Sequence, residues 1–264
     1  MLPADVERAT GRYLAVADRL LPGRIAGFYV VGSVALGAWR ADRSDIDFIA
    51  VVEGDLPPRR LRALHALGNL TAAGRAVRRV DPAIPGTVNG AFIAVDDLGL
   101  PVTTIRPLGS HSGWTVKLGR GFEVNPVVWK VLRDSGVAVR GPEPALLGLD
   151  PEPGRLREWN LGQLRGHWRG WGEGLASGSV RRANPGRVLG PPRLHHTVVT
   201  GEVISKEAAA EYALDTFGSR WEPLMRAALA HRDGMPVAFA GLLRAAGEFT
   251  LEVLAEAESR STVD

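Results

Sequence analysis

The sequence of 264 residues contains no cysteine, which excludes disulfide bonds and metal sites built from thiolates. It also lacks any apolar run of the ~18 residues that a membrane-spanning helix requires. The amino-terminal residues include the acids Asp5 and Glu7 and do not resemble a secretory signal peptide. These absences predict a cytoplasmic protein without a membrane partner.

Lysine is scarce: it occurs only at positions 117, 130 and 206, while arginine supplies the remaining basic charge. The formal net charge is +3, and acidic residues are interspersed with the basic ones. A dense basic segment of the kind that follows a nucleic-acid backbone is missing, so nucleic acid is not an expected partner. A small anion such as a nucleoside triphosphate is enough to use the modest basic surplus, and a monomer is expected.

Residues 25–52 form the most informative stretch, which reads as a strand, a turn, a short helix, a polar loop and a second strand. Gly32 lets the backbone approach a ligand closely, and Ser33 begins a helix whose free N–H groups suit phosphate oxygens. Asp45 and Asp47 open the second strand and point to the same face. Two such carboxylates repel each other unless a cation lies between them, and Mg²⁺ is commonly held by one or two carboxylates together with substrate phosphates. The stretch therefore predicts a nucleotide site.

Each part of this pattern has an ordinary structural explanation when it is taken alone. Ser33 is then a helix N-cap, and Ser44 with Asp45 is turn chemistry before a strand. The combination of Gly-Ser, a short helix and Asp-x-Asp on two successive strands is far less common. It resembles the signature of the nucleotidyltransferase superfamily typified by DNA polymerase beta. It is not a Walker P-loop, because the Gly-Lys-Ser/Thr ending is absent.

The length allows one large domain or two ordinary ones, and 45% apolar with 23% charged residues is typical of a globular protein. Before the Pro/Gly clusters at 141–144 and 150–154, the patterns predict helices at 4–21, 57–73 and 125–134, strands at 25–31, 46–52, 88–95 and 137–140, and an irregular segment at 101–124. After these clusters they predict helices at 156–171, 188–200, 205–217, 221–231 and 237–259, with a loop at 172–186. The expected fold class is α+β, with a nucleotidyltransferase domain at 1–150, whose mixed sheet is flanked by helices, and an all-α helical bundle at 151–264.

The second half of the chain strengthens the resemblance. The segment RLHHTVVTGEVISKEAAAEYAL, from Arg193 to Leu214, is similar to the carboxy-terminal helical domain of the aminoglycoside adenylyltransferases that modify streptomycin and spectinomycin. That family has the same arginine, a Thr-Gly turn, a lysine opening the next helix and an Ala-Ala-aromatic-Ala helix. The segment VLRDSGVAVRGPEP also matches the family's connection between its domains, so the resemblance extends from the Gly-Ser signature to about Arg232.

The resemblance implies a nucleotide site to which both domains contribute, with the helical domain clamping the nucleotide or substrate. It assigns Mg²⁺ to Asp45 and Asp47. The residues that it assigns to the phosphates of the co-substrate ATP are Gly32, Ser33, Arg193, Lys206 and Arg232. Arginine binds phosphate as a planar fork and lysine as a compact charge. Lys206 could instead be an exposed first-turn residue, but a cation there opposes the helix dipole and calls for a nearby anion.

Two positions depart from the family, and both concern the acceptor. The family's third carboxylate, its general base, falls on Asn89, whose amide cannot accept a proton at neutral pH. Loss of a general base typically costs ~10²–10⁴ in rate. The family's aspartate that binds the drug's cationic groups falls on Ala183. Trp114 matches a family tryptophan that packs on the drug, and a core or lid aromatic is the alternative explanation for it. The acceptor's proton would then leave through water, through an acceptor amine or through another acid such as Glu123.

The leading interpretation is a Mg²⁺-dependent enzyme that transfers AMP from ATP to a hydroxyl of a small molecule. It is similar to an aminoglycoside adenylyltransferase of antibiotic resistance, with an altered acceptor site and no general base. One alternative is a nucleotide-binding sensor or accessory subunit without transferase activity. Asn89 supports this alternative, and the Asp45/Asp47 pair argues against it. Transfer onto a protein or nucleic acid is a third, supported only by the arginines of the 172–186 loop.

Overall fold

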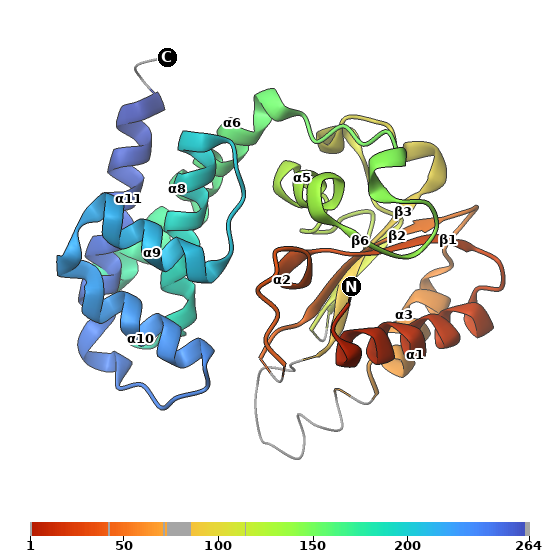
Figure 1. Cartoon of the computed structure of the whole chain (residues 1–264), viewed down its shortest axis with the longest axis horizontal. Coiled ribbons are helices and arrows are strands. Elements are labelled where there is room, and N and C mark those ends of the chain that lie inside the picture. Colours follow the sequence, from red (N-terminus) through yellow and green to blue (C-terminus); the bar gives the residue numbers. More distant parts are fainter. Residues whose placement is uncertain (1, 42, 71, 73–85, 114, 262–264) are drawn as a thin grey trace. The chain divides into compact units, whose positions relative to one another are not determined.

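The structure, a computed structural model, describes residues 2–41, 43–70, 72, 86–113 and 115–261 (Figure 1). The chain divides into two compact units, Met1–Glu152 and Pro153–Asp264. None of the helices in the described ranges is long and apolar enough to cross a membrane. The fold class is the expected α+β arrangement, with a mixed sheet in the first unit and helices in the second.

The described strands of the first unit form one sheet in the order β5-β4-β3-β2-β1-β6. Their bounds are Ile25–Val30 (β1), Ile46–Val52 (β2), Val88–Ala94 (β3), Gly109–Ser112 (β4), Thr115–Leu118 (β5) and Val137–Arg140 (β6). Strands β2 and β3 are parallel, and the other neighbours are antiparallel. This topology places the beginnings of β2 and β3 at the same edge of the sheet as the end of β1.

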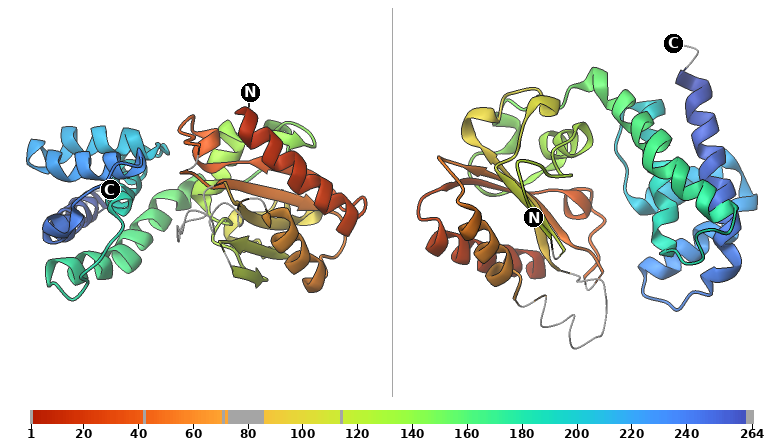
Figure 2. Two further views of the ribbon diagram at one scale, coloured as in Figure 1. Left: turned by 90° about the horizontal axis from the view of Figure 1, so that it is seen from below. Right: turned by 180° about the vertical axis from the view of Figure 1, so that it is seen from behind.

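The two faces of the sheet have different coverings (Figures 1 and 2). Helices α1 (Ala4–Leu20) and α3 (Pro58–Gly68) lie on one face, and α5 (Pro126–Ser135) lies on the other. Buried aromatic rings fill the α1/α3 side, where Phe28 stacks on Phe48 with ring centroids 4.6 Å apart. Because strand side chains alternate, Asp47, the neighbour of Phe48, points to the opposite face.

The segment 101–124 is more regular than its sequence suggests, because it contains the hairpin of β4 and β5. β4 (GSHS) has no apolar residue, and the alternation in β5 (TVKL) extends over only four residues, so the sequence gives a weak strand signal. β4 is held instead by antiparallel pairing with β3, and its His111 is buried in the aromatic core. Helix α3 is also shorter than expected and ends at Gly68; the expected end near residue 73 lies outside the described residues.

In the part that the structure describes, the second unit consists of helices and their connecting loops. Its α-helices are Pro153–Gln163 (α6), Arg169–Ala176 (α7), Gly190–Thr200 (α8), Lys206–Phe217 (α9), Glu222–Arg232 (α10) and Leu243–Ser261 (α11), and a π-helical turn at Leu164–Trp168 joins α6 to α7. The core between them includes Phe217, Trp221, Met225 and Phe249. Two expected helix ends are confirmed: Gly201, with φ of +74°, stops α8, and the Ser205 hydroxyl caps α9 by accepting from the Ala208 N–H at 3.1 Å.

The expected loop at 172–186 is confined to residues 177–184, because both of its ends are helical. Helix α7 continues to Ala176, and a 3₁₀ turn follows at Pro185–Leu189. Helix α7 packs closely against α11 through glycines on both helices: a β-carbon on Gly172 would lie 3.2 Å from the Leu251 side chain, and one on Gly247 of α11 would lie 2.6 Å from the Gly172 carbonyl oxygen. Glycine lowers helix propensity, so this tertiary contact decides the conformation.

Candidate functional site

The end of β1 and the beginning of β2 bring Gly32 against Asp47. Gly32 has φ of +63°, a conformation that favours glycine, and a β-carbon at this position would overlap the Asp47 carboxylate. The Val31 N–H donates to the Asp47 carbonyl oxygen at 2.9 Å, which fixes the two chain segments together. Gly32 was expected to make room for a ligand; in the structure it makes room for the side chain of Asp47.

Ser33 follows in the short helix α2 (Gly32–Ala35). Its Oγ is buried and makes no hydrogen bond with any of the described residues. A buried hydroxyl normally has a partner, since leaving it unpaired costs about 1–3 kcal/mol. An unpartnered Oγ on the residue that follows Gly32 is therefore a candidate ligand contact.

The two aspartates frame the buried Ile46. Asp45 precedes β2 and is exposed, Asp47 is half-buried, and Ile46 is 1% exposed on the core side. Among the described residues, no group of three or more His, Asp or Glu side chains is placed to hold a metal ion. Two carboxylates with no third acid are a donor set that fits one Mg²⁺ only if substrate phosphates complete its shell.

Asn89 is the direct neighbour of Asp47 across the parallel β2–β3 pair. Its side chain is 3% exposed, and its Oδ1 accepts a hydrogen bond from the Gly113 N–H at 3.2 Å. Val88, the residue before Asn89 in β3, is held by the side-chain amide of Asn69. This amide accepts from the Val88 N–H at 2.7 Å and donates to the Val88 carbonyl at 3.1 Å. The position counted from the sequence therefore lies beside the aspartates, and it holds an amide engaged with the β4–β5 turn.

Glu123 lies in the turn between β5 and α5. The turn is closed by the Val124 N–H, which donates to the Gly121 carbonyl at 3.3 Å, and Asn125 then caps α5 by accepting from the Val128 N–H at 3.0 Å. Burial raises the pKa of the Glu123 carboxyl, against the opposing effects of its own backbone N–H and of Lys117. Sequence patterns give no sign of this environment, because it depends on how the turn folds back.

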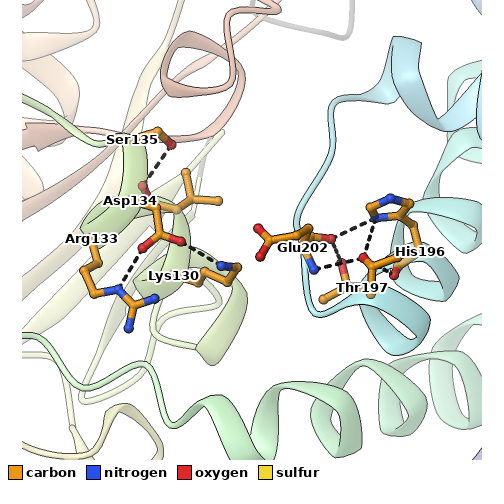
Figure 3. Close-up of polar contacts among 9 residues, drawn as sticks. Lys130, Arg133, Asp134, Ser135, His196, Thr197 and Glu202 are labelled. Atoms are coloured by element: carbon orange, nitrogen blue, oxygen red, sulfur yellow. Dashed lines mark hydrogen bonds and ion pairs between the residues drawn. The ribbon is translucent and has the colours of Figure 1, made fainter.

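Helix α5, which packs against α2, carries a compact charged group (Figure 3). Lys130 Nζ lies 2.7 Å from Asp134 Oδ2, and Arg133 Nε lies 2.7 Å from Asp134 Oδ1. Burial opposes ionisation of Asp134, but the hydrogen bonds from Arg133 and Lys130 outweigh it and hold the pKa of Asp134 below its usual value. Asp134 thus forms its ion pairs with residues of its own helix.

In the second unit, Arg193 and Lys206 are linked through the α8–α9 loop. Arg193 Nε donates to the Ile204 carbonyl at 2.9 Å. Figure 3 shows the neighbouring contacts, in which His196 Nδ1 and the Thr197 hydroxyl both donate to the Glu202 carbonyl, at 2.9 and 3.0 Å. These bonds hold the loop on α8 and so set where Lys206 begins α9.

Arg232 belongs to the same neighbourhood. It ends α10 and binds Glu207 at the start of α9, with Nε at 3.0 Å and Nη2 at 2.8 Å from one carboxylate oxygen. Sequence reasoning missed Glu207, since a pairing between two helices leaves no local pattern. Three expected phosphate-binding cations are therefore gathered around the first turn of α9.

The two expected drug-binding positions have different outcomes. Trp114 lies outside the described residues. Ala183 lies in the segment between α7 and the 3₁₀ turn, is half-buried, and packs against the hydrophobic core of the second unit.

Comparisons with known proteins address both units. Residues 179–256 match a family described as aminoglycoside adenylyltransferase, C-terminal domain, and residues 13–79 match the nucleotidyltransferase domain family. A search of curated protein sequences gave no match. Among solved structures, the spectinomycin adenyltransferase AAD(9) from Enterococcus faecialis, crystallised with ATP and spectinomycin, has a similar fold. Its TM-score is 0.68 at 14% sequence identity, and the match covers 94% of this chain and 98% of that one.

Proposed function

The chain belongs to the aminoglycoside adenylyltransferase family of the nucleotidyltransferase superfamily, and from this premise we propose that it transfers AMP from ATP to a hydroxyl group of a small molecule. The observation that carries the proposal is the meeting of Gly32, Ser33 and Asp47 at one edge of the sheet. The buried Ser33 Oγ has no partner among the described residues, and the glycine is required by the carboxylate beside it. A ligand with phosphate oxygens would satisfy the hydroxyl.

Asp45 and Asp47 are the residues that would hold Mg²⁺. When bound, the ion would neutralise phosphate oxygens and favour departure of pyrophosphate. The two aspartates are suited to this role because their own mutual repulsion is relieved by a cation. With only two carboxylates in the set, metal and nucleotide binding should be strongly coupled.

We assign the triphosphate to Arg193, Lys206 and Arg232 in addition to Ser33. The hydrogen bond from Arg193 Nε to the Ile204 carbonyl fixes this side chain beside the α8–α9 loop, and Lys206 is exposed at the first turn of α9. In the reaction, the acceptor oxygen attacks the α-phosphorus in line, the bond to the bridging oxygen breaks, and pyrophosphate leaves. Cations around the leaving group stabilise the charge that develops on it.

The acceptor is a hydroxyl compound, for which spectinomycin is the first candidate because the structurally similar AAD(9) was crystallised with it. Such a reaction would make the protein an antibiotic-resistance enzyme. Asn89 and Ala183 support an acceptor site different from the family's usual one. A nucleotide-binding role without transfer is the second candidate, and Asn89 in the place of a general base is the observation that favours it.

Incubation with MgATP labelled at the α-phosphate tests the proposal. We expect label to move onto spectinomycin or streptomycin in the wild type and not in Asp47→Asn. Tight MgATP binding by calorimetry with no labelled product from any hydroxyl acceptor would favour the nucleotide-binding role instead.

A further inference from the structure

We infer that Glu123 takes the proton from the attacking hydroxyl, the task that a carboxylate at position 89 would otherwise perform. The inference rests on the proposed function, because it names the proton acceptor of that reaction. It is carried by the position of the turn 119–125 on the sheet and by the surroundings of the carboxylate.

Glu123 lies on the same face of the sheet as Asp47 and Asn89. Asn89 pairs with Asp47, and Ala91, two residues further along β3, pairs with Ser110 of β4. Residues paired across neighbouring strands share a face, as do residues two apart on one strand. The Ser110 side chain therefore points to the side of the sheet to which Asp47 and Asn89 point.

The turn that carries Glu123 is attached to this face at Ser110. The Ser110 hydroxyl donates to the Arg120 carbonyl at 2.8 Å. Gly121 lies so close that a β-carbon on it would be 2.8 Å from Ser110 Cβ and 3.3 Å from Glu123 Oε2. The Glu123 carboxylate thus stands above Ser110. With strands ~4.8 Å apart and ~3.3 Å of rise per residue, Ser110 lies about 8 Å from Asn89 in the plane of the sheet.

An acceptor molecule bound above Asn89 would lie between the aspartates and Glu123. Its hydroxyl could then contact the Glu123 carboxylate by a direct hydrogen bond or through one bridging water. Asn89 itself accepts from Gly113 and has no basic site, so it can orient the acceptor but not deprotonate it.

Three other acids of the described first unit are paired with other groups. Asp134 is paired with Lys130 and Arg133, Asp18 with Arg140, and Glu152 accepts from the Thr103 N–H at 2.6 Å. Burial raises the pKa of the Glu123 carboxyl, and its own backbone N–H and Lys117 only partly offset the effect. A general base works best when its pKa approaches the working pH, so the shift is in the useful direction.

The proton balance of the step is simple. The O–H bond of the acceptor breaks and its proton passes to Glu123 Oε2, while the oxygen forms its bond to the α-phosphorus. The α-phosphorus bond to the bridging oxygen breaks, and pyrophosphate leaves with the electron pair. Glu123, now a carboxylic acid, returns the proton to solvent after the product has left.

The test compares Glu123→Gln, which keeps shape and hydrogen bonding, with Glu53→Gln, a change at an exposed acid of the same unit. Each protein is incubated with α-labelled MgATP, and transfer is followed to spectinomycin and to water, which yields free AMP. We expect Glu123→Gln to lower both rates by ~10²–10⁴ without weakening MgATP binding, and Glu53→Gln to change neither.

Two further measurements separate proton transfer from a structural role. The wild-type kcat/KM should fall as the pH drops through the pKa of Glu123, and this acidic limb should be absent in Glu123→Gln. The double variant Asn89→Glu/Glu123→Gln has a carboxylate at position 89 instead of position 123. It should transfer AMP at least tenfold faster than Glu123→Gln alone.

The failures are distinguishable. Absence of MgATP binding by the wild type would overturn the proposed function. MgATP binding with no product from either acceptor, an unchanged rate in Glu123→Gln, or a loss of MgATP affinity in that variant would each overturn the role of Glu123 while leaving the nucleotide site in place.

Discussion

The Asp47 carboxylate fills the space that a β-carbon on Gly32 would need, so the end of β1 and the beginning of β2 can meet only if position 32 is glycine. The positive φ of Gly32 adds a second, independent reason for glycine. The Gly-Ser half and the aspartate half of the signature are therefore one packed unit.

Gly32→Ala should displace the Asp47 carboxylate and weaken MgATP binding by at least tenfold. Gly37→Ala is the matched control: Gly37 has φ of +66°, but a β-carbon there would meet nothing within 4 Å. Both variants should lose about 1–2 kcal/mol of stability from the left-handed backbone. Titration calorimetry with thermal melting separates the effects; equal loss of affinity in both variants would show that backbone strain alone is responsible.

Asp45→Asn and Asp47→Asn should each abolish Mg²⁺-dependent nucleotide binding and AMP transfer while the protein stays folded. The side chains lie on the exposed or half-buried side of the strand, so the change removes charge and repulsion but no core packing. Asp96→Asn, at an exposed acid of the same unit, should bind MgATP as the wild type does. A clear drop in melting temperature with activity retained would make the two aspartates structural residues.

The fold was largely predictable because its main elements carry periodic or capping signals. The apolar strands β1 to β3, the Ser205 cap of α9 and the Gly201 stop of α8 are all visible in the sequence. The hairpin β4–β5 and the glycine-containing α7 are not, because pairing with β3 and close packing on α11 determine them. Local patterns cannot report contacts between segments distant in the chain.

Part of the geometry around the candidate site follows from the strand order. The resemblance assigns the family's third carboxylate to position 89, and in the strand register Asn89 is the neighbour of Asp47. The surroundings of Glu123 and the pairing of Arg232 with Glu207 depend on a turn and on two helices that meet in space. The roles of the expected phosphate-binding residues stay predictions.

Lys206→Ala should weaken MgATP binding by about tenfold with an unchanged melting temperature, since its side chain is exposed. Arg193→Ala should weaken binding and also lower stability, because the Ile204 carbonyl loses its donor. Arg244→Ala, at an exposed arginine paired with Glu248 on α11, is the control for loss of a cation. Wild-type affinity in both Lys206→Ala and Arg193→Ala would remove the second unit from the nucleotide site.

Stability should fall in mild acid because of His111. Burial lowers the pKa of His111 to about 3, against 6.5 for an ordinary histidine, so only the unfolded chain takes up this proton between those values. Stability contributed by the neutral ring is complete above about pH 6.5 and declines as the pH falls, by at most ~1.4 kcal/mol per unit. His111→Gln can still bond Tyr13 and should show a shallower decline in urea unfolding; parallel curves would contradict the assignment.

The last prediction concerns the altered acceptor side. Wild-type protein should bind MgATP well but adenylylate streptomycin or spectinomycin more slowly than a variant with a carboxylate at position 89, because the proposed base Glu123 stands farther from Asp47 than residue 89 does. Asn89→Glu should raise the rate further, since it adds a second possible base directly beside Asp47. Asn89→Gln, which lengthens the side chain without adding a base, should bring no gain.

Recovery with streptomycin should stay incomplete in Asn89→Glu, because Ala183 supplies no anion for the drug's cationic groups. One charged hydrogen bond is worth ~1.5–3 kcal/mol, so Asn89→Glu with Ala183→Asp should exceed either single change in kcat/KM. Ala183 packs against the core of the second unit, and a carboxylate there should lower the melting temperature. Rates are therefore compared well below that temperature. Fast modification of both drugs by the wild type would contradict this account, since it would mean that the residues present already form a complete acceptor site.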